Sequence, residues 1–152
     1  MSKENKIIKV YVDNCVLSKL LRNNYPEELR GIKVSRMGRS VNFLHACAFS
    51  LEIGTKIGEY IIHYANGEIK RAPIVYGKKV MDWLVSPEGE HCTEAEEVWS
   101  GSNAATRGVG QKTCLTKYNW ENPLPDVEIT AIDFISSLNN SAPFLVAITI
   151  EP

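Results

Sequence analysis

The chain has 152 residues, of which 44% are hydrophobic and 23% charged, and these values are typical of one globular domain with its own core. The formal net charge is −1, from 17 basic and 18 acidic side chains. This balance argues against a nucleic-acid-binding protein, because such proteins usually carry a basic excess or a basic stripe.

The sequence also lacks the long apolar stretches that direct a chain into or across a membrane. No apolar run approaches the roughly 20 residues of a membrane-spanning helix, so we expect no membrane partner. Residues 1–5 are polar and of mixed charge, without the apolar core of a signal peptide. We therefore expect a cytoplasmic protein from the sequence as written, or an extracellular one if a signal has been removed.

The N-terminal part, residues 1–31, is expected to hold one strand and one short helix. The strand is predicted at residues 7–12. The helix is predicted at residues 15–23, because four apolar residues recur there at helical spacing. Pro26 and Gly31 are then expected to break the chain before the next strand.

The remainder, residues 32–151, has the residue pattern of a β domain. Strands are predicted at residues 32–36, 41–49, 57–65, 68–76, 111–120, 127–136 and 144–150. Residues 86–93 and 100–110 are expected to be loops, and residues 122–126 a turn. The whole chain therefore predicts a single all-β domain, a β-sandwich or jelly roll with one short N-terminal helix.

Asn66-Gly67 is the clearest local signal, because this dipeptide between two apolar runs is typical of a two-residue hairpin turn. Such a turn places Tyr64 opposite Ile69. Pro73 in the returning strand cannot donate a ladder hydrogen bond, so we expect it at a sheet edge or at the end of the strand.

The sequence carries no recognisable catalytic motif. It has no nucleophile elbow, no HExxH pair and no phosphate-binding glycine loop, so we expect no catalytic residues. Paired carboxylates are the usual requirement for glycoside hydrolysis, and five glutamates cluster in the second half of the chain. They are Glu88, Glu90, Glu94, Glu96 and Glu97, and in a Gly- and Pro-containing loop they are interpreted as a solvated acidic surface.

Metal ligands are also sparse. The four cysteines, Cys15, Cys47, Cys92 and Cys114, have wide and irregular spacing, which predicts buried free thiols, or disulfides if the protein is exported. Two histidines combine with two of them into a Cys₂His₂ set: His45, Cys47, His91 and Cys92. Their spacing matches no zinc signature, so we expect no metal site. Oxygen ligands for a structural calcium ion are available at Asp82, Asn103 and Asp126.

The three tryptophans, Trp83, Trp99 and Trp120, lie in the second half of the chain, at predicted strand ends or beside loops. Each is followed or preceded by polar residues, as in sugar-binding modules that stack a sugar ring on an indole and bind its hydroxyl groups with polar side chains. The alternative is that all three pack in the core or at its corners.

Four stretches together resemble a known domain type. They are NFLHACA at residues 42–48, GEYIIHYANGEIKRAPIVYG at 58–77, VMDW at 80–83, and residues 99–103 with KYNWENPLPDVEITAIDF at 117–134. In order and spacing they are similar to a galactose-binding-like β-sandwich domain found in bacterial secreted and multidomain proteins, often beside carbohydrate-active modules. The resemblance covers about residues 32 to 151.

This resemblance implies a jelly roll whose loops at one end bind a saccharide, sometimes with a structural calcium ion. Together with the tryptophan pattern it gives these candidate carbohydrate-binding residues: Asp82, Trp83, Trp99, Asn103, Arg107, Trp120 and Asn122. The predicted function is a non-catalytic, carbohydrate-binding module. The alternatives are a protein-interaction or structural module, self-associating or binding a protein through an exposed sheet face, and a small hydrolase built around the acidic loop.

Overall fold

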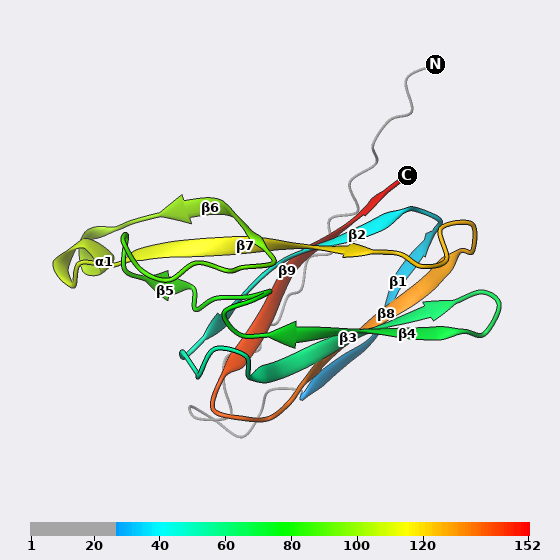
Figure 1. The fold of residues 1–152 in the computed structure, drawn as a ribbon, viewed down its shortest axis with the longest axis horizontal. Helices are drawn as coiled ribbons and strands as arrows, with labels where there is room; N and C mark the ends of the chain where they lie inside the picture. The colour runs from blue at the N-terminus through cyan, green and yellow to red at the C-terminus, as the bar shows by residue number, and fades with distance from the viewer. Residues whose placement is uncertain (1–26) are drawn as a thin grey trace, which may run out of the picture.

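The structure is a computed structural model that describes residues 27–152. The strand predicted at residues 7–12 and the helix predicted at residues 15–23 lie outside this described part. Within it, two antiparallel sheets form a β-sandwich (Figure 1). The predicted all-β sandwich is therefore confirmed. No helix in residues 27–152 is both long enough and apolar enough to span a membrane.

The first sheet has four strands in the order β1-β8-β3-β4. Their bounds are β1 Glu28–Arg36, β8 Ile129–Ser136, β3 Lys56–Tyr64 and β4 Ile69–Val75. The second sheet has five strands, with the path β5-β7-β2-β9 and β6 paired to the other edge of β7. Their bounds are β5 Leu84–Val85, β7 Lys112–Glu121, β2 Ser40–Ala48, β9 Ala142–Glu151 and β6 Glu96–Gly101. The short helix α1, Ala104–Gly108, joins β6 to β7.

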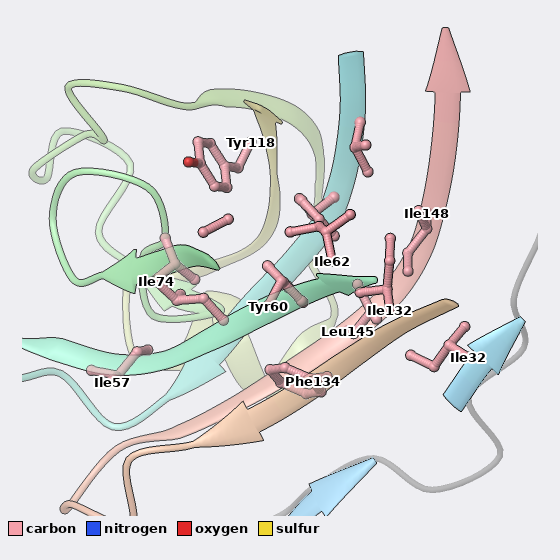
Figure 2. Packing of buried hydrophobic residues seen from close by; sticks show 14 of the residues in the cluster. Ile32, Ile57, Tyr60, Ile62, Ile74, Tyr118, Ile132, Phe134, Leu145 and Ile148 are labelled. Carbon is pink, nitrogen blue, oxygen red and sulfur yellow. The ribbon is translucent and has the colours of Figure 1, made fainter. Parts of the chain in front are cut away.

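The core fills the space between the sheets. Figure 2 shows Ile62 of β3, Ile132 of β8 and Ile148 of β9 meeting there, and all three are buried. Phe43 of β2 stacks on Tyr60 of β3, with ring centroids 3.7 Å apart and ring planes 2° from parallel. Each large side chain removed from water in this way contributes on the order of 2 kcal/mol, so this interior is the main source of stability.

One polar group, His45 of β2, lies fully buried in this interior. Its Nε2 lies 2.7 Å from the carbonyl oxygen of Lys79, which can only accept, so Nε2 carries the proton. Nδ1 then accepts a hydrogen bond of 2.7 Å from the hydroxyl of Tyr60. Burial lowers the pKa of His45 to about 4, against the opposing effect of the Lys79 carbonyl, and the ring is neutral at physiological pH.

The hairpin at Asn66-Gly67 exists, but its loop is one residue longer than predicted. His63, not Tyr64, lies opposite Ile69. The amide of Gly67 donates to the carbonyl of Tyr64 at 3.0 Å, and Gly67 has φ 86°. This is the three-residue hairpin that a glycine in the left-handed region closes. The two-residue prediction was therefore wrong in register by one.

Pro73 lies in β4, an edge strand of the first sheet. The predicted edge position is confirmed. The missing amide costs no ladder bond there, because the strand has a neighbour on one side only within the described part of the chain.

Two predictions for the connecting segments were wrong. Gly31 does not break the chain: β1 already begins at Glu28, and Gly31, with φ 70°, forms a bulge inside it. Residues 100–110, predicted as a loop, contain the end of β6 and helix α1. In the last strand, Val146 is an extra residue in the pairing with β2, and it leaves Leu145 and Ile148 both buried.

The buried neutral His45 predicts a loss of stability in acid. The unfolded chain takes up a proton at His45 below about pH 6.5, whereas the native ring does so only near pH 4. The free energy of unfolding should therefore fall by up to about 3 kcal/mol as the pH drops from 6.5 to 4. Urea unfolding across this range measures the slope. His45→Gln should flatten it, and His91→Gln, at an exposed loop residue, should not.

The backbone of the hairpin loop at Gly67 has a conformation that only glycine adopts without strain. Gly67→Ala should lower the free energy of unfolding by about 1 kcal/mol, because an L side chain is disfavoured at φ 86°. Gly108→Ala is the matched control, since Gly108 has open space around it and no positive φ. Equal effects of the two substitutions in urea titrations would contradict the three-residue loop.

Candidate functional site

The predicted site residues separate to the two ends of β7. This strand spans ten residues, or roughly 34 Å. Trp83 and Trp99 lie beside its first half, whereas Trp120 and Asn122 lie at and just beyond its last residues. Figure 1 shows β5, β6 and α1 gathered at one end of the molecule and the β3–β4 hairpin at the other. We call the first of these, with residues 112–116 of β7, the α1 end.

The tryptophans of the α1 end lie on opposite edges of β7. Trp83 accepts a hydrogen bond from the amide of Cys114 through its carbonyl at 2.8 Å, and its side chain is 38% exposed. Trp99 of β6 lies opposite Leu115 on the other edge and is 52% exposed. Two of the three tryptophans are therefore partly exposed rather than packed wholly in the core.

Val98 explains why β6 presents Trp99 outward. It is an extra residue in the pairing with β7, so that Glu97 lies opposite Thr116 and Trp99 opposite Leu115. Thr116 is buried, and Leu115 points to the other face of the sheet. Glu97 is accordingly directed to the inner face and Trp99 to the outer face.

The Trp99 ring lies against Gly101, two residues further along β6. A side chain at Gly101 would meet the ring, because a Cβ atom placed there would lie 2.8 Å from the indole. Gly101 therefore permits the close approach of the ring to the strand, which restricts the orientations open to this exposed indole.

A pocket of about 180 Å³ opens on the inner side of this end, beneath the loop of residues 86–95. Its lining combines apolar, thiol and ionisable groups: Met81, Val85, Glu90, His91, Cys92, Ala95, Glu97, Cys114 and Thr116. The loop is attached to the preceding segment through backbone hydrogen bonds, from Thr93 to the Gly77 carbonyl at 3.3 Å and from Glu94 to the Lys78 carbonyl at 2.8 Å. The pocket is therefore bounded by both a strand and a fixed loop.

The ionisable groups of the pocket differ in charge state. Burial raises the pKa of Cys92 to about 12 and that of Cys114 to about 11, so both thiols are protonated near neutral pH and are weak nucleophiles. Glu97 pairs with Lys112 at 2.6 Å. Cys47 and Cys114 are buried free thiols, as predicted, and Cys92 is half-buried.

Three further predicted site residues of the α1 end make hydrogen bonds to neighbouring residues. The carboxylate of Asp82 accepts hydrogen bonds from the Ser50 hydroxyl at 3.0 Å and the Leu84 amide at 2.9 Å. Asn103 caps α1 by accepting from the amide of Thr106 at 3.0 Å. Arg107 is exposed and donates to the Ser102 hydroxyl at 3.3 Å. Arg107 and Asn103 are thus exposed, whereas Asp82 is buried.

At the other end, Asn122 is buried and fully engaged. Its Oδ1 accepts from the Tyr64 hydroxyl at 2.5 Å and the Leu124 amide at 3.0 Å, and its Nδ2 donates to the Gly38 carbonyl at 2.6 Å. It therefore holds the predicted turn at residues 122–126 against the β3–β4 hairpin. Trp120 is half-buried and packs on the core.

The structure does not assemble the ligand sets considered for metals. Both ring nitrogens of His45 are occupied by Tyr60 and the Lys79 carbonyl. Among residues 27–152 no three histidine, cysteine or acidic side chains are grouped so as to bind a metal ion. Asp126 lies in the turn beyond the far end of β7, whereas Asp82 and Asn103 lie at the α1 end.

Sequence reasoning missed the pocket. Glu90 and Glu97, interpreted as solvated surface, line it, together with Cys114 and Thr116 of β7. The inward alternation of Cys114 and Thr116 is visible in the sequence, but their apposition to the loop of residues 86–95 depends on the sheet pairing.

Comparison with known proteins gave no match: no family model, no curated protein and no solved structure matches this chain.

The buried hydrogen bonds of Asn122 predict that this side chain contributes to the stability of the fold. Asn122→Ala should lower the free energy of unfolding by about 2–3 kcal/mol, because it leaves the buried Tyr64 hydroxyl and Gly38 carbonyl without their partner. Asn140→Ala, at an exposed loop residue, is the control and should change stability by less than about 0.5 kcal/mol. Thermal and urea unfolding measure both. A neutral Asn122→Ala would contradict this assignment.

Proposed function

We propose that the domain is a non-catalytic binding module that binds carbohydrate at the α1 end. The observation that carries this proposal is the pair of exposed tryptophans, Trp83 and Trp99, at the end of the sheet where the pocket opens. Tryptophan is enriched at binding interfaces, because its large side chain combines an apolar surface with a hydrogen-bond donor.

Trp99 is the proposed stacking platform. A sugar ring presents C–H groups on its faces, and an indole offers them a large apolar surface with few rotatable bonds. The contact of Trp99 with Gly101 restricts the orientations of the ring before a ligand arrives, which reduces the entropy lost on binding. Half of this side chain remains accessible.

Polar groups for sugar hydroxyls are available at the α1 end. Glu90, His91 and Glu97 line the pocket, and Arg107 is exposed on α1. The pocket, at about 180 Å³, is smaller than the roughly 300–1,000 Å³ typical of drug-sized ligands. This size favours one sugar residue over an oligosaccharide inside it.

The resemblance of residues 32–151 to galactose-binding-like domains supports the same proposal. The β-sandwich that this resemblance implied is present. The saccharide site of such a domain is expected in loops at one end of the sandwich, and the α1 end holds the loop of residues 86–95 and the segment of residues 102–111.

A protein-interaction module is the second candidate. β6 is an edge strand within the described residues, and it exposes Val98 and Trp99. An edge of this kind can accept an extended peptide as an added strand. The two candidates predict different effects of the same substitutions, because strand addition depends on the backbone of β6 and sugar stacking depends on the indole.

The experiment is a glycan panel followed by titration of hits with tryptophan fluorescence. Trp99→Ala should weaken binding at least tenfold, and Trp83→Ala should weaken it to a smaller degree. Gly101→Val should also weaken binding although it leaves Trp99 in the chain, because the added side chain displaces the ring. Trp120→Phe, at the far end of β7, should leave affinity unchanged.

Circular dichroism and melting curves confirm that each variant is folded. The carbohydrate proposal fails if no glycan on the panel quenches fluorescence or shifts the melting temperature. Glycan binding that survives Trp99→Ala and Trp83→Ala unchanged would place the site elsewhere.

A further inference from the structure

The outer face of the second sheet has a distinct residue pattern where β6 runs beside β7 (Figure 1). Successive cross-strand pairs on this face are Gly101–Thr113, Trp99–Leu115 and Glu96–Lys117. The extra residue Val98 keeps Glu96 and Trp99 on the same face although they are three residues apart. An apolar pair therefore lies between a hydroxyl group on one side and an ion pair on the other.

The indole of Trp99 extends along β6 toward Gly101. A Cβ atom placed on Gly101 would lie 2.8 Å from Cη2 and 2.9 Å from Cζ2 of the ring, and 3.5 Å from Oγ1 of Thr113. The Thr113 hydroxyl thus lies beside the ring on the same face. It donates to the Gly101 carbonyl at 2.9 Å, and its oxygen keeps the capacity to accept a hydrogen bond. This part of the face therefore combines an apolar ring with a hydrogen-bond acceptor.

The ion pair between Glu96 and Lys117 lies on the other side of the apolar pair. Nζ of Lys117 is 3.4 Å from a carboxylate oxygen of Glu96, and the two side chains are 40% and 69% exposed. An exposed ion pair of this kind contributes little to stability. A carboxylate accepts hydrogen bonds and an ammonium group donates them, so the pair can bind two neighbouring hydroxyl groups. Because it has no net charge, it suits a neutral sugar.

The pocket lies on the opposite face of these strands. Glu97, next to Glu96 in the chain, lies opposite the buried Thr116, lines the pocket and pairs with Lys112 at 2.6 Å. The backbones of β6 and β7 separate this second ion pair from the indole of Trp99. A ligand stacked on Trp99 therefore meets Glu96 rather than Glu97.

The length of this outer face sets the size of a matching ligand. Thr113 and Lys117 are four residues apart on β7, which corresponds to roughly 14 Å. This distance exceeds the width of one sugar ring. A carbohydrate that contacts both residues therefore has at least two sugar units.

We propose, on the basis of the carbohydrate-binding function above, that the outer face of β6 and β7 binds a neutral oligosaccharide. One sugar ring stacks on Trp99 beside Thr113. The next lies over Leu115, and Glu96 and Lys117 bind its hydroxyl groups. The site is distinct from the pocket, and its specificity depends on an ion pair that the pocket does not contain.

Titrations with a monosaccharide and an oligosaccharide of the same sugar, chosen from the panel hits, test this two-part site. Glu96→Gln and Lys117→Met should each weaken oligosaccharide binding about tenfold, because each removes a hydrogen bond to a charged group. Both should leave monosaccharide affinity unchanged, since a single ring stacked on Trp99 does not reach the ion pair. Glu97→Gln and Lys112→Met, on the inner face, are the matched controls and should change neither affinity.

Three results would overturn the proposal, and they separate it from the carbohydrate function itself. Oligosaccharide binding that Trp99→Ala weakens but Glu96→Gln and Lys117→Met leave unchanged would remove the second sugar position while the function stands. A loss of binding in Glu97→Gln alone would place the sugar in the pocket. Absence of binding to every glycan would overturn both the oligosaccharide site and the function.

Methyl resonances of the unsubstituted protein report the face of the sheet directly. With saturating oligosaccharide, the methyl signals of Thr113 and Leu115 should shift. Those of Met81 and Val85, which line the pocket, should not. The reverse pattern would contradict the outer-face site. Melting curves confirm that each variant used in the titrations is folded.

Discussion

The hydrogen bond between His45 and Tyr60 is the contact on which much of this structure depends. It joins β2 of the second sheet to β3 of the first, within a largely apolar interior. The other ring nitrogen of His45 binds the carbonyl of Lys79, just before the segment that leads to Trp83. One side chain therefore ties together both sheets and the chain that enters the α1 end. A buried polar group gains from having every partner present, because each missing bond in a low-dielectric interior is costly.

Much of the sandwich could be predicted, because each strand carries its own alternation of apolar and polar residues. The central strands β2, β3, β7 and β8 lie close to their predicted bounds. The hairpin was misjudged by one residue because Asn-Gly suits both a two-residue and a three-residue loop, and only pairing with β3 decides between them. Bulges at Gly31 and Val146 were also missed, since an extra residue is defined by the partner strand.

The candidate site could be predicted only in part, for a related reason. Trp83, Trp99 and Trp120 carry the same local signal. The sequence shows neither which of them is exposed nor that Trp120 lies at the opposite end of β7. The pocket arises where a loop returns over Cys114 and Thr116. The contact between this loop and β7 depends on pairing between strands that are far apart in the sequence. Residue types alone therefore identify candidate site residues, but they do not show which of them lie together.

β7 reaches beyond its pairing with β2, which ends at Thr116. Residues 112–115 of the strand are held by the short β5 and by β6, while the main interior lies under the other half of the strand. One half of β7 thus packs on the main interior, and the other half carries the α1 end. Substitutions and insertions between residues 86 and 110 would change the α1 end with little effect on the packing of the main interior. This end of the domain is therefore well suited to diversification of its binding preference during evolution, and to loop grafting in the laboratory.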